Sequence, residues 1–260
     1  MTPTMAKAIA LFDIDGVVRD VSTSYRQALI DTVNHFTQGA YSPSQMEIDQ
    51  LKTEGLWNND WEASQELIRR YFINQAQLPP MIDFAQLVSF FQHQYWGPDP
   101  QHCTGYICQE SVLMSYDYLS QLTDEGIFWG FFSGAERPSA EYVLQTRLGT
   151  ESPVLVAMED APGKPDPTGL LMALAQLESN WDDNRPVVYV GDTVADMMVI
   201  NNVRERYPQR RWVGVGVIPP HAHNRSASYL QNLRNAGAVK VVQHVHELTP
   251  DAIYSLFKNG

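Results

Sequence analysis

Two acidic residues directly follow a short apolar run near the start of the chain. Residues Ala8–Phe12 (AIALF) are continuously apolar, as is typical of a strand buried on both faces, and Asp13 and Asp15 come next. Gly16 then permits a sharp turn. Because open α/β sheets bind ligands at the carboxyl ends of their strands, the two carboxylates are expected at the edge of a reactive site.

A second acidic group follows another apolar run, Val187–Val190, and contains Asp192 and Asp196. If the two strands are neighbours, three or four carboxylates converge. Like charges about 4 Å apart repel by roughly 4 kcal/mol at an effective dielectric constant of about 20. Such a cluster therefore needs a bound cation or a raised pKa. Because all the donors are oxygens, the first expectation is Mg²⁺.

Two further strand ends carry groups that bind anions. Ser133 and Gly134 follow the apolar run Ile127–Phe132, and Lys164 lies in the loop after the run Val154–Ala157. A hydroxyl, exposed backbone amides and one ammonium together favour an anion, most simply phosphate.

The elements that must position these groups alternate between strand and helix from about residue 111. A helix is predicted over Val112–Asp124, and others begin near Pro138, Asp166 and Val194. Five strands are expected after the first, at Ile127–Phe132, Val154–Ala157, Val187–Val190, Trp212–Val217 and Val239–Val242. This alternation predicts an α/β fold, a doubly wound, Rossmann-like parallel sheet with helices on both faces.

For residues 21–110 the sequence predicts helices and no strands. Apolar residues recur at helical spacing, and Ser44 with Glu47 three residues on predicts a capping box. We therefore expect residues 1–20 and 111–260 to form a catalytic core and residues 21–110 to form an inserted, all-helical domain.

Composition excludes several classes of protein. The 260 residues carry a net charge of −12, which argues against nucleic acid and anionic membranes as partners. The two cysteines, Cys103 and Cys108, are too few for a disulfide framework, and we expect buried thiols in a reducing cytoplasm. The sequence contains no apolar run long enough for a membrane span and no signal-peptide layout.

These motifs together resemble the haloacid dehalogenase superfamily of phosphatases, in the subfamily with a C1-type helical cap after the first motif. The matching motifs are Asp13–Asp20 (DIDGVVRD), Ser133, Lys164 and Gly191–Asp196 (GDTVAD). The resemblance covers nearly the whole chain. The set of four motifs is highly specific for the superfamily and not for a substrate.

The resemblance implies a role for each acid. Asp13 would be the nucleophile that forms an aspartyl-phosphate, and Asp15 would be the general acid and base. Mg²⁺ would be held by Asp13, by the backbone carbonyl of Asp15 and by Asp192. Asp196 would be either a ligand through water or a partner of Lys164.

The resemblance also implies the phosphate contacts and the type of leaving group. Ser133, the Gly134 amide and Lys164 would hold the phosphoryl oxygens as charge develops. Similar enzymes that expel a halide lack an acid at the position of Asp15, so its presence favours phosphoryl transfer.

Caps of this subfamily supply substrate contacts. The segment expected to do so here contributes Lys52, Gly55, Trp57, Asn58, Asn59 and Asp60. The alternative is a polar loop between helices in which Asp60 is an N-cap. Arg19 departs from the usual apolar or small residue at its place. It either contacts a second anionic group of the substrate or, as we favour, pairs with Asp20.

The leading interpretation is a Mg²⁺-dependent phosphatase for a small phosphorylated metabolite, of the sugar phosphate or amino-alcohol phosphate type. The alternatives are a phosphosugar mutase of the same fold and a non-catalytic, phosphate-binding regulatory protein. The sequence sets no oligomeric state.

Overall fold

The computed structural model describes residues 7–57, 59–99, 102–178 and 184–258. The chain divides into two compact units. We call Met1–Asp20 with Val112–Gly260 the core unit, and Val21–Ser111 the helical unit. The helical unit differs from the insertion expected at residues 21–110 by one residue, Ser111.

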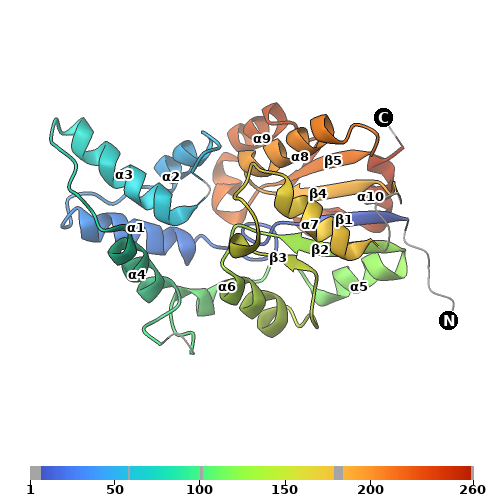
Figure 1. The fold of residues 1–260 in the computed structure, drawn as a ribbon, viewed down its shortest axis with the longest axis horizontal. Coiled ribbons are helices and arrows are strands. Elements are labelled where there is room, and N and C mark those ends of the chain that lie inside the picture. Colours follow the sequence, from blue (N-terminus) through green and yellow to red (C-terminus); the bar gives the residue numbers. More distant parts are fainter. Residues whose placement is uncertain (1–6, 58, 100–101, 179–183, 259–260) are drawn as a thin grey trace. The chain divides into compact units, whose positions relative to one another are not determined.

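The core unit contains a parallel sheet in the order β3-β2-β1-β4-β5-β6, and Figure 1 labels β1 to β5 of it. Its strands are β1 (Ala8–Phe12), β2 (Ile127–Phe132), β3 (Leu155–Val156), β4 (Val187–Gly191), β5 (Trp212–Val217) and β6 (Lys240–Val242). The predicted bounds of β1, β2 and β5 are confirmed, and those of the other three differ by one residue at one or both ends.

Helices pack on both faces of this sheet. They are α5 (Tyr116–Asp124), α6 (Arg137–Glu141), α7 (Thr168–Leu177), α8 (Val194–Arg206), α9 (Ser226–Asn235) and α10 (Pro250–Leu256), with short 3₁₀ turns at Met158–Asp160, Pro220–Arg225 and Val245–Glu247. Successive side chains of β1 point to opposite faces. Phe12 packs in a cluster with residues of α5 and α10, whereas Leu11 packs with residues of α7 and α8. The expected doubly wound α/β fold is confirmed.

One predicted helix was wrong at its start. It begins at Tyr116 rather than at Val112, and Ser115 caps it by accepting a hydrogen bond from Tyr118 N at 3.3 Å. Val112 instead forms an isolated β-bridge with Arg19. The backbone before the helix thus pairs with the segment that follows β1, a contact that helical periodicity does not reveal.

The helical unit contains α1 (Tyr25–Phe36), α2 (Gln45–Lys52), α3 (Asp60–Asn74), α4 (Phe84–Tyr95) and the 3₁₀ turn η1 (Tyr106–Gln109). The predicted capping box of Ser44 and Glu47 at the start of α2 is confirmed. Helix α1 packs on α3 and α4, and Tyr25 stacks on Tyr95 with ring centroids 3.9 Å apart. Aromatic residues of this unit therefore form its own core.

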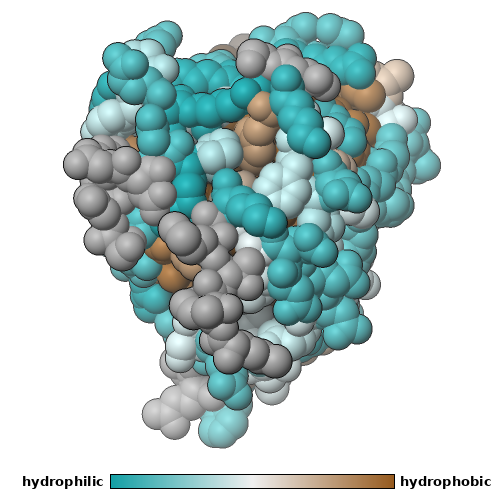
Figure 2. Space-filling view, turned by 90° about the vertical axis from the view of Figure 1, so that its right-hand side faces the viewer, coloured by the Kyte–Doolittle hydropathy of each residue, from teal (hydrophilic) through white to brown (hydrophobic). Residues whose placement is uncertain are grey.

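The surface is mainly polar on the face shown in Figure 2, with hydrophobic residues in a few small patches. Within the described part of the chain, no helix combines the length and the apolar character that crossing a membrane requires.

Candidate active site

The sheet order reverses between β1 and β4, so these two strands flank the topological switch point. Phe12 pairs with Val190 at the ends of the two strands, and Asp13 N donates a hydrogen bond to Val190 O at 2.8 Å. Ligands of open α/β sheets bind at this point. The first and fourth predicted motifs thus meet at the place where a doubly wound sheet forms its crevice.

Three carboxylates converge there. One oxygen from each of Asp13, Asp192 and Asp196 lies within 4.8 Å of the others, and all three residues are buried. Gly16 permits the approach of Asp192, because its φ is +74° and a Cβ there would lie 2.2 Å from Asp192 Oδ2. Gly191 does the same for Asp196, whose Cγ would lie 2.3 Å from a Cβ. The donor set is all oxygen, which fits Mg²⁺.

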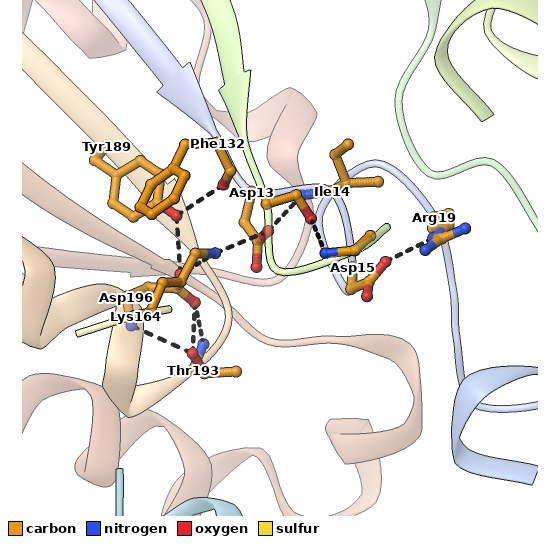
Figure 3. A network of polar contacts seen from close by, with 11 residues as sticks. Asp13, Ile14, Asp15, Arg19, Phe132, Lys164, Tyr189, Thr193 and Asp196 are labelled. Atoms are coloured by element: carbon orange, nitrogen blue, oxygen red, sulfur yellow. Dashed lines mark hydrogen bonds and ion pairs between the residues drawn. The ribbon is translucent and has the colours of Figure 1, made fainter. Parts of the chain in front are cut away.

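Lys164 lies against two of these acids, as Figure 3 shows. Its Nζ is 2.9 Å from Asp13 Oδ1 and 2.7 Å from Asp196 Oδ1, and the ammonium also lies over the rings of Phe132 and Tyr189. Burial alone would lower the pKa of Lys164, but the two carboxylates raise it above its usual value. The ammonium is therefore charged and directed into the acidic cluster.

The pKa values of the two acids differ because their partners differ. Burial raises the pKa of Asp13 to about 7, and the charges of Asp196 and Asp15 add to the effect of burial, although Lys164 opposes it. Burial also acts to raise the pKa of Asp196, but Lys164 and the donors of Thr193 outweigh it, so the pKa is lowered. The surroundings thus favour the charged form of Asp196 beside Lys164 and the protonated form of Asp13.

Asp196 is fixed from both sides. Thr193 donates to its Oδ2 from the backbone N at 2.9 Å and from Oγ1 at 2.6 Å, in a capping box that starts α8. The Tyr189 hydroxyl lies 3.0 Å from Asp196 Oδ1 and 3.1 Å from Phe132 O. Of the two roles expected for Asp196, the structure contains the ion pair with Lys164.

The predicted phosphate-binding residues follow β2, the other neighbour of β1. Ser133 is buried, its N donates to Val156 O at 3.0 Å, and its Oγ accepts a hydrogen bond from Ala135 N at 3.2 Å. Gly134 is the next residue and is half-buried. Because Phe12, the last residue of β1, pairs with Phe131, one residue before the end of β2, Ser133 and Asp13 lie at the same edge of the sheet.

Asp15 has a different environment. It is absent from the three-carboxylate cluster, and its side chain turns toward Arg19, whose Nε lies 2.6 Å from Asp15 Oδ1 (Figure 3). Arg19 was expected to pair with Asp20, and its pair with Asp15 was not predicted, although the spacing of four residues was a signal. Its contact with Ser139, whose Oγ accepts a hydrogen bond from Arg19 Nη1 at 3.0 Å, was not predicted either.

The segment between α2 and α3 is ordered by local contacts. Asn59 is the N-cap of α3, since its side chain accepts a hydrogen bond from Trp61 N at 2.9 Å; the alternative reading of Asp60 as the N-cap is wrong by one residue. Asp60 pairs with Lys52 at 2.8 Å. Gly55 has a φ of +74°, as a tight bend requires.

Two further residues of this segment were predicted to contact substrate. Trp57 donates from Nε1 to Glu54 at 2.8 Å and lines a cavity of about 570 Å³ in the helical unit, together with Glu62 and Arg69. Asn58 lies outside the described residues.

The thiols of Cys103 and Cys108 are half-buried rather than fully buried. Their sulfurs lie 2.7 Å apart, a proximity that the sequence analysis did not anticipate.

Known proteins resemble this chain in sequence and in fold. An imidazoleglycerol-phosphate dehydratase from Phytophthora nicotianae is 31% identical over 221 residues, which are 83% of this chain and 44% of that protein. The chain thus spans less than half the length of this relative.

Solved structures share the fold at lower sequence identity. A phosphonoacetaldehyde hydrolase-like protein from Oleispira antarctica superposes with a TM-score of 0.69 at 18% identity, covering 99% of this chain and 96% of that one. The protein CbbY from Rhodobacter sphaeroides, solved with phosphate, gives 0.64 at 16% identity, covering 94% and 96%.

The sequence profile of one family extends over most of the chain. The profile of the haloacid dehalogenase-like hydrolases matches residues 7–204, which include all four motifs. This chain therefore belongs to the haloacid dehalogenase-like hydrolases.

Proposed function

We propose that the chain is a Mg²⁺-dependent phosphatase that hydrolyses a small phosphomonoester through an aspartyl-phosphate on Asp13. The observation that supports this most strongly is the contact of Asp13 Oδ1 with Lys164 Nζ at 2.9 Å, beside Asp192 at the switch point. A carboxylate next to a charged ammonium and a set of metal ligands is suited to attack a phosphoryl group whose own charge must be neutralised.

Asp13 and Asp15 have different roles in the proposed reaction. Ile14 N and Lys164 both contact Asp13 Oδ1, which fixes the plane of the nucleophile. A carboxylate oxygen of Asp13 forms the new bond to phosphorus as the bond from phosphorus to the ester oxygen breaks. Asp15 gives its proton to that ester oxygen and later takes one from the water that hydrolyses the aspartyl-phosphate.

The remaining groups stabilise the charge of the transferring phosphoryl group. Ser133, the Gly134 amide and Lys164 hold its oxygens. Asp13, Asp192 and the backbone carbonyl of Asp15 would hold Mg²⁺, with Asp196 contacting it through water or only orienting Lys164. The ion supplies positive charge that offsets the repulsion between the acids and the phosphate.

We propose an amino-alcohol phosphate or a sugar phosphate as the substrate. The relative from Phytophthora nicotianae is named for imidazoleglycerol-phosphate, itself a phosphomonoester of a polyol. The substrate panel should therefore include imidazoleglycerol phosphate and imidazole-bearing amino-alcohol phosphates beside common sugar phosphates.

The experiment is phosphate release from this panel with Mg²⁺, measured for the wild type and for Asp13→Asn. Release that requires both Mg²⁺ and Asp13 supports the proposal. Isomerisation that depends on an added bisphosphate, with little phosphate released, would identify a mutase. Binding of phosphate without turnover of any ester would identify a non-catalytic protein.

We also propose that the segment from Lys52 to Asp60 helps to select the substrate. Asp60→Asn removes one charge from the pair with Lys52, and Asp117→Asn removes one from an exposed position in the first turn of α5, in the core unit. The expected result is a changed ranking of substrates for Asp60→Asn and an unchanged ranking for Asp117→Asn. If the two variants rank the substrates in the same order, a role for Asp60 in substrate selection is contradicted.

A further inference from the structure

Arg19 is a buried charge next to the active site. Its side chain is fully buried in the core unit, whereas the side chain of Asp15 is 26% exposed. Burying an arginine costs free energy unless its guanidinium is paired and hydrogen-bonded. The buried guanidinium of Arg19 therefore requires hydrogen-bond acceptors and a negative charge, and the groups that supply them indicate the role of Arg19.

The backbone around Arg19 is fixed at both ends. Arg19 N donates to Ile14 O at 3.1 Å, and Arg19 O accepts from Gly16 N at 2.9 Å, which closes the loop that carries Asp15. Arg19 also forms a β-bridge with Val112. The backbone of Arg19 is thus held in place by hydrogen bonds, so the fold determines the direction in which the guanidinium donors point.

The side chain of Arg19 joins two motifs. Nε lies 2.6 Å from Asp15 Oδ1, and Nη1 donates to Ser139 Oγ at 3.0 Å. Ser139 is buried on α6, the helix that follows Ser133 and Gly134. The carboxyl group of Asp15 is therefore tied, through one guanidinium, to the helix next to the phosphate-binding residues.

We propose that Arg19 is a positioning residue for the general acid, an inference that rests on the proposed phosphatase function. By holding Oδ1 in a charge-assisted hydrogen bond, Arg19 fixes the plane of the Asp15 carboxyl group. Proton transfer is then assigned to Oδ2. The Oδ2–H bond breaks as the ester oxygen accepts the proton and keeps the electron pair of its broken bond to phosphorus.

The dependence of the rate on the leaving group tests this role. Nitrophenolate leaves without protonation, whereas an alkoxide such as that of glycerol 2-phosphate needs the proton of Asp15. We expect Arg19→Gln to lower kcat for glycerol 2-phosphate at least about tenfold more than kcat for 4-nitrophenyl phosphate. Arg19→Lys should recover part of the selective loss.

A matched control is another buried arginine pair of the core unit. Arg210 contacts Glu178 through Nη1 at 2.9 Å and donates from Nε to Arg185 O at 2.8 Å. Arg210→Gln removes a comparable pair that lies before the first residues of β4 and β5, at the opposite edge of the sheet from the motifs, and should change kcat for both substrates by the same factor. A purely structural role of Arg19 would give that same pattern.

The outcomes separate the two proposals. A wild type that hydrolyses neither ester overturns the phosphatase function, and with it this inference. A wild type that hydrolyses both, with equal losses in Arg19→Gln, overturns the positioning role alone. If Arg19→Gln does not fold, Ser139→Ala is tested with the same two esters instead. We expect a selective loss for the alkyl ester of about threefold, because the guanidinium loses one anchor, and an equal loss for both esters contradicts the role.

Discussion

Lys164 and Asp196 form an ion pair with Nζ and Oδ1 2.7 Å apart, and neither side chain is more than 1% exposed. The same ammonium contacts Asp13, so one cation is shared between a permanent anion and an acid with a raised pKa. The net charge of the three side chains therefore depends on whether Asp13 is protonated. A bound divalent cation would favour the ionised form of Asp13.

Replacing Lys164 by Met should destabilise the protein by about 3–5 kcal/mol, because it leaves Asp196 buried without its counter-ion. The measurement is urea unfolding followed by circular dichroism. Lys52→Met is the control, since its pair with Asp60 is partly exposed and should contribute no more than about 1 kcal/mol. Equal losses of unfolding free energy in Lys164→Met and Lys52→Met would contradict the conclusion that Lys164 and Asp196 form a buried ion pair.

Asp13→Asn should stabilise the protein in the presence of a chelator at pH 8 and leave its stability nearly unchanged at pH 4. Burial raises the pKa of Asp13 well above its ordinary value, to about 7, so ionisation of this acid lowers the free energy of unfolding progressively as the pH rises from that ordinary value to about 7. Asn carries no charge at either pH. The difference in free energy of unfolding between variant and wild type, measured in urea at both values, checks this. A difference independent of pH contradicts it.

Binding of Mg²⁺ should release a proton below about pH 7. The ion requires an ionised Asp13, whose pKa burial raises to about 7, so affinity should fall by up to about tenfold per unit as the pH drops below that value. Titration calorimetry in two buffers of different ionisation enthalpy counts the protons. The expected count is close to one at pH 6 and close to zero at pH 8, and equal affinity at the two values excludes this linkage.

Gly191→Ala should displace Asp196 and lower both stability and activity. A Cβ would lie 2.3 Å from Asp196 Cγ, and the expected cost of overpacking is about 1–3 kcal/mol. Gly214→Ala is the control in the neighbouring strand, because its Cβ would lie 3.3 Å from the flexible side chain of Met197. Melting temperatures and initial rates of both variants give the comparison, and a larger effect at Gly214 would contradict the steric argument.

Most of the fold could be predicted from the sequence because β1, β4 and β5 are buried over their whole length. The runs that became β1, β2 and β5 are apolar from end to end, so their bounds could be predicted from hydrophobicity alone. The four motifs follow β1, β2, β3 and β4 in order, and the strand order brings them to one edge of the sheet. A local signal was therefore enough to place Asp13, Ser133 and Asp192.

Contacts between distant residues could not be predicted in the same way. Tyr189 reads as one more apolar residue of a strand, and its hydroxyl contacts Asp196 and Phe132 O only because β4 and α8 have formed. Ser139 lies 120 residues from Arg19 in the chain, so their hydrogen bond has no local signature. Val112 forms a β-bridge with Arg19 and Leu113 N donates to Val18 O, so these two residues pair with the first motif instead of joining α5, despite their helical pattern.

The most direct test of the account is to trap the phosphorylated protein. The wild type is quenched in acid during turnover of its best ester with Mg²⁺, treated with borohydride to reduce any aspartyl-phosphate to homoserine, and digested for mass spectrometry. We predict homoserine at position 13, and none there in a sample without substrate. Steady phosphate release by the wild type with Asp13 recovered unmodified under these conditions would contradict the central claim.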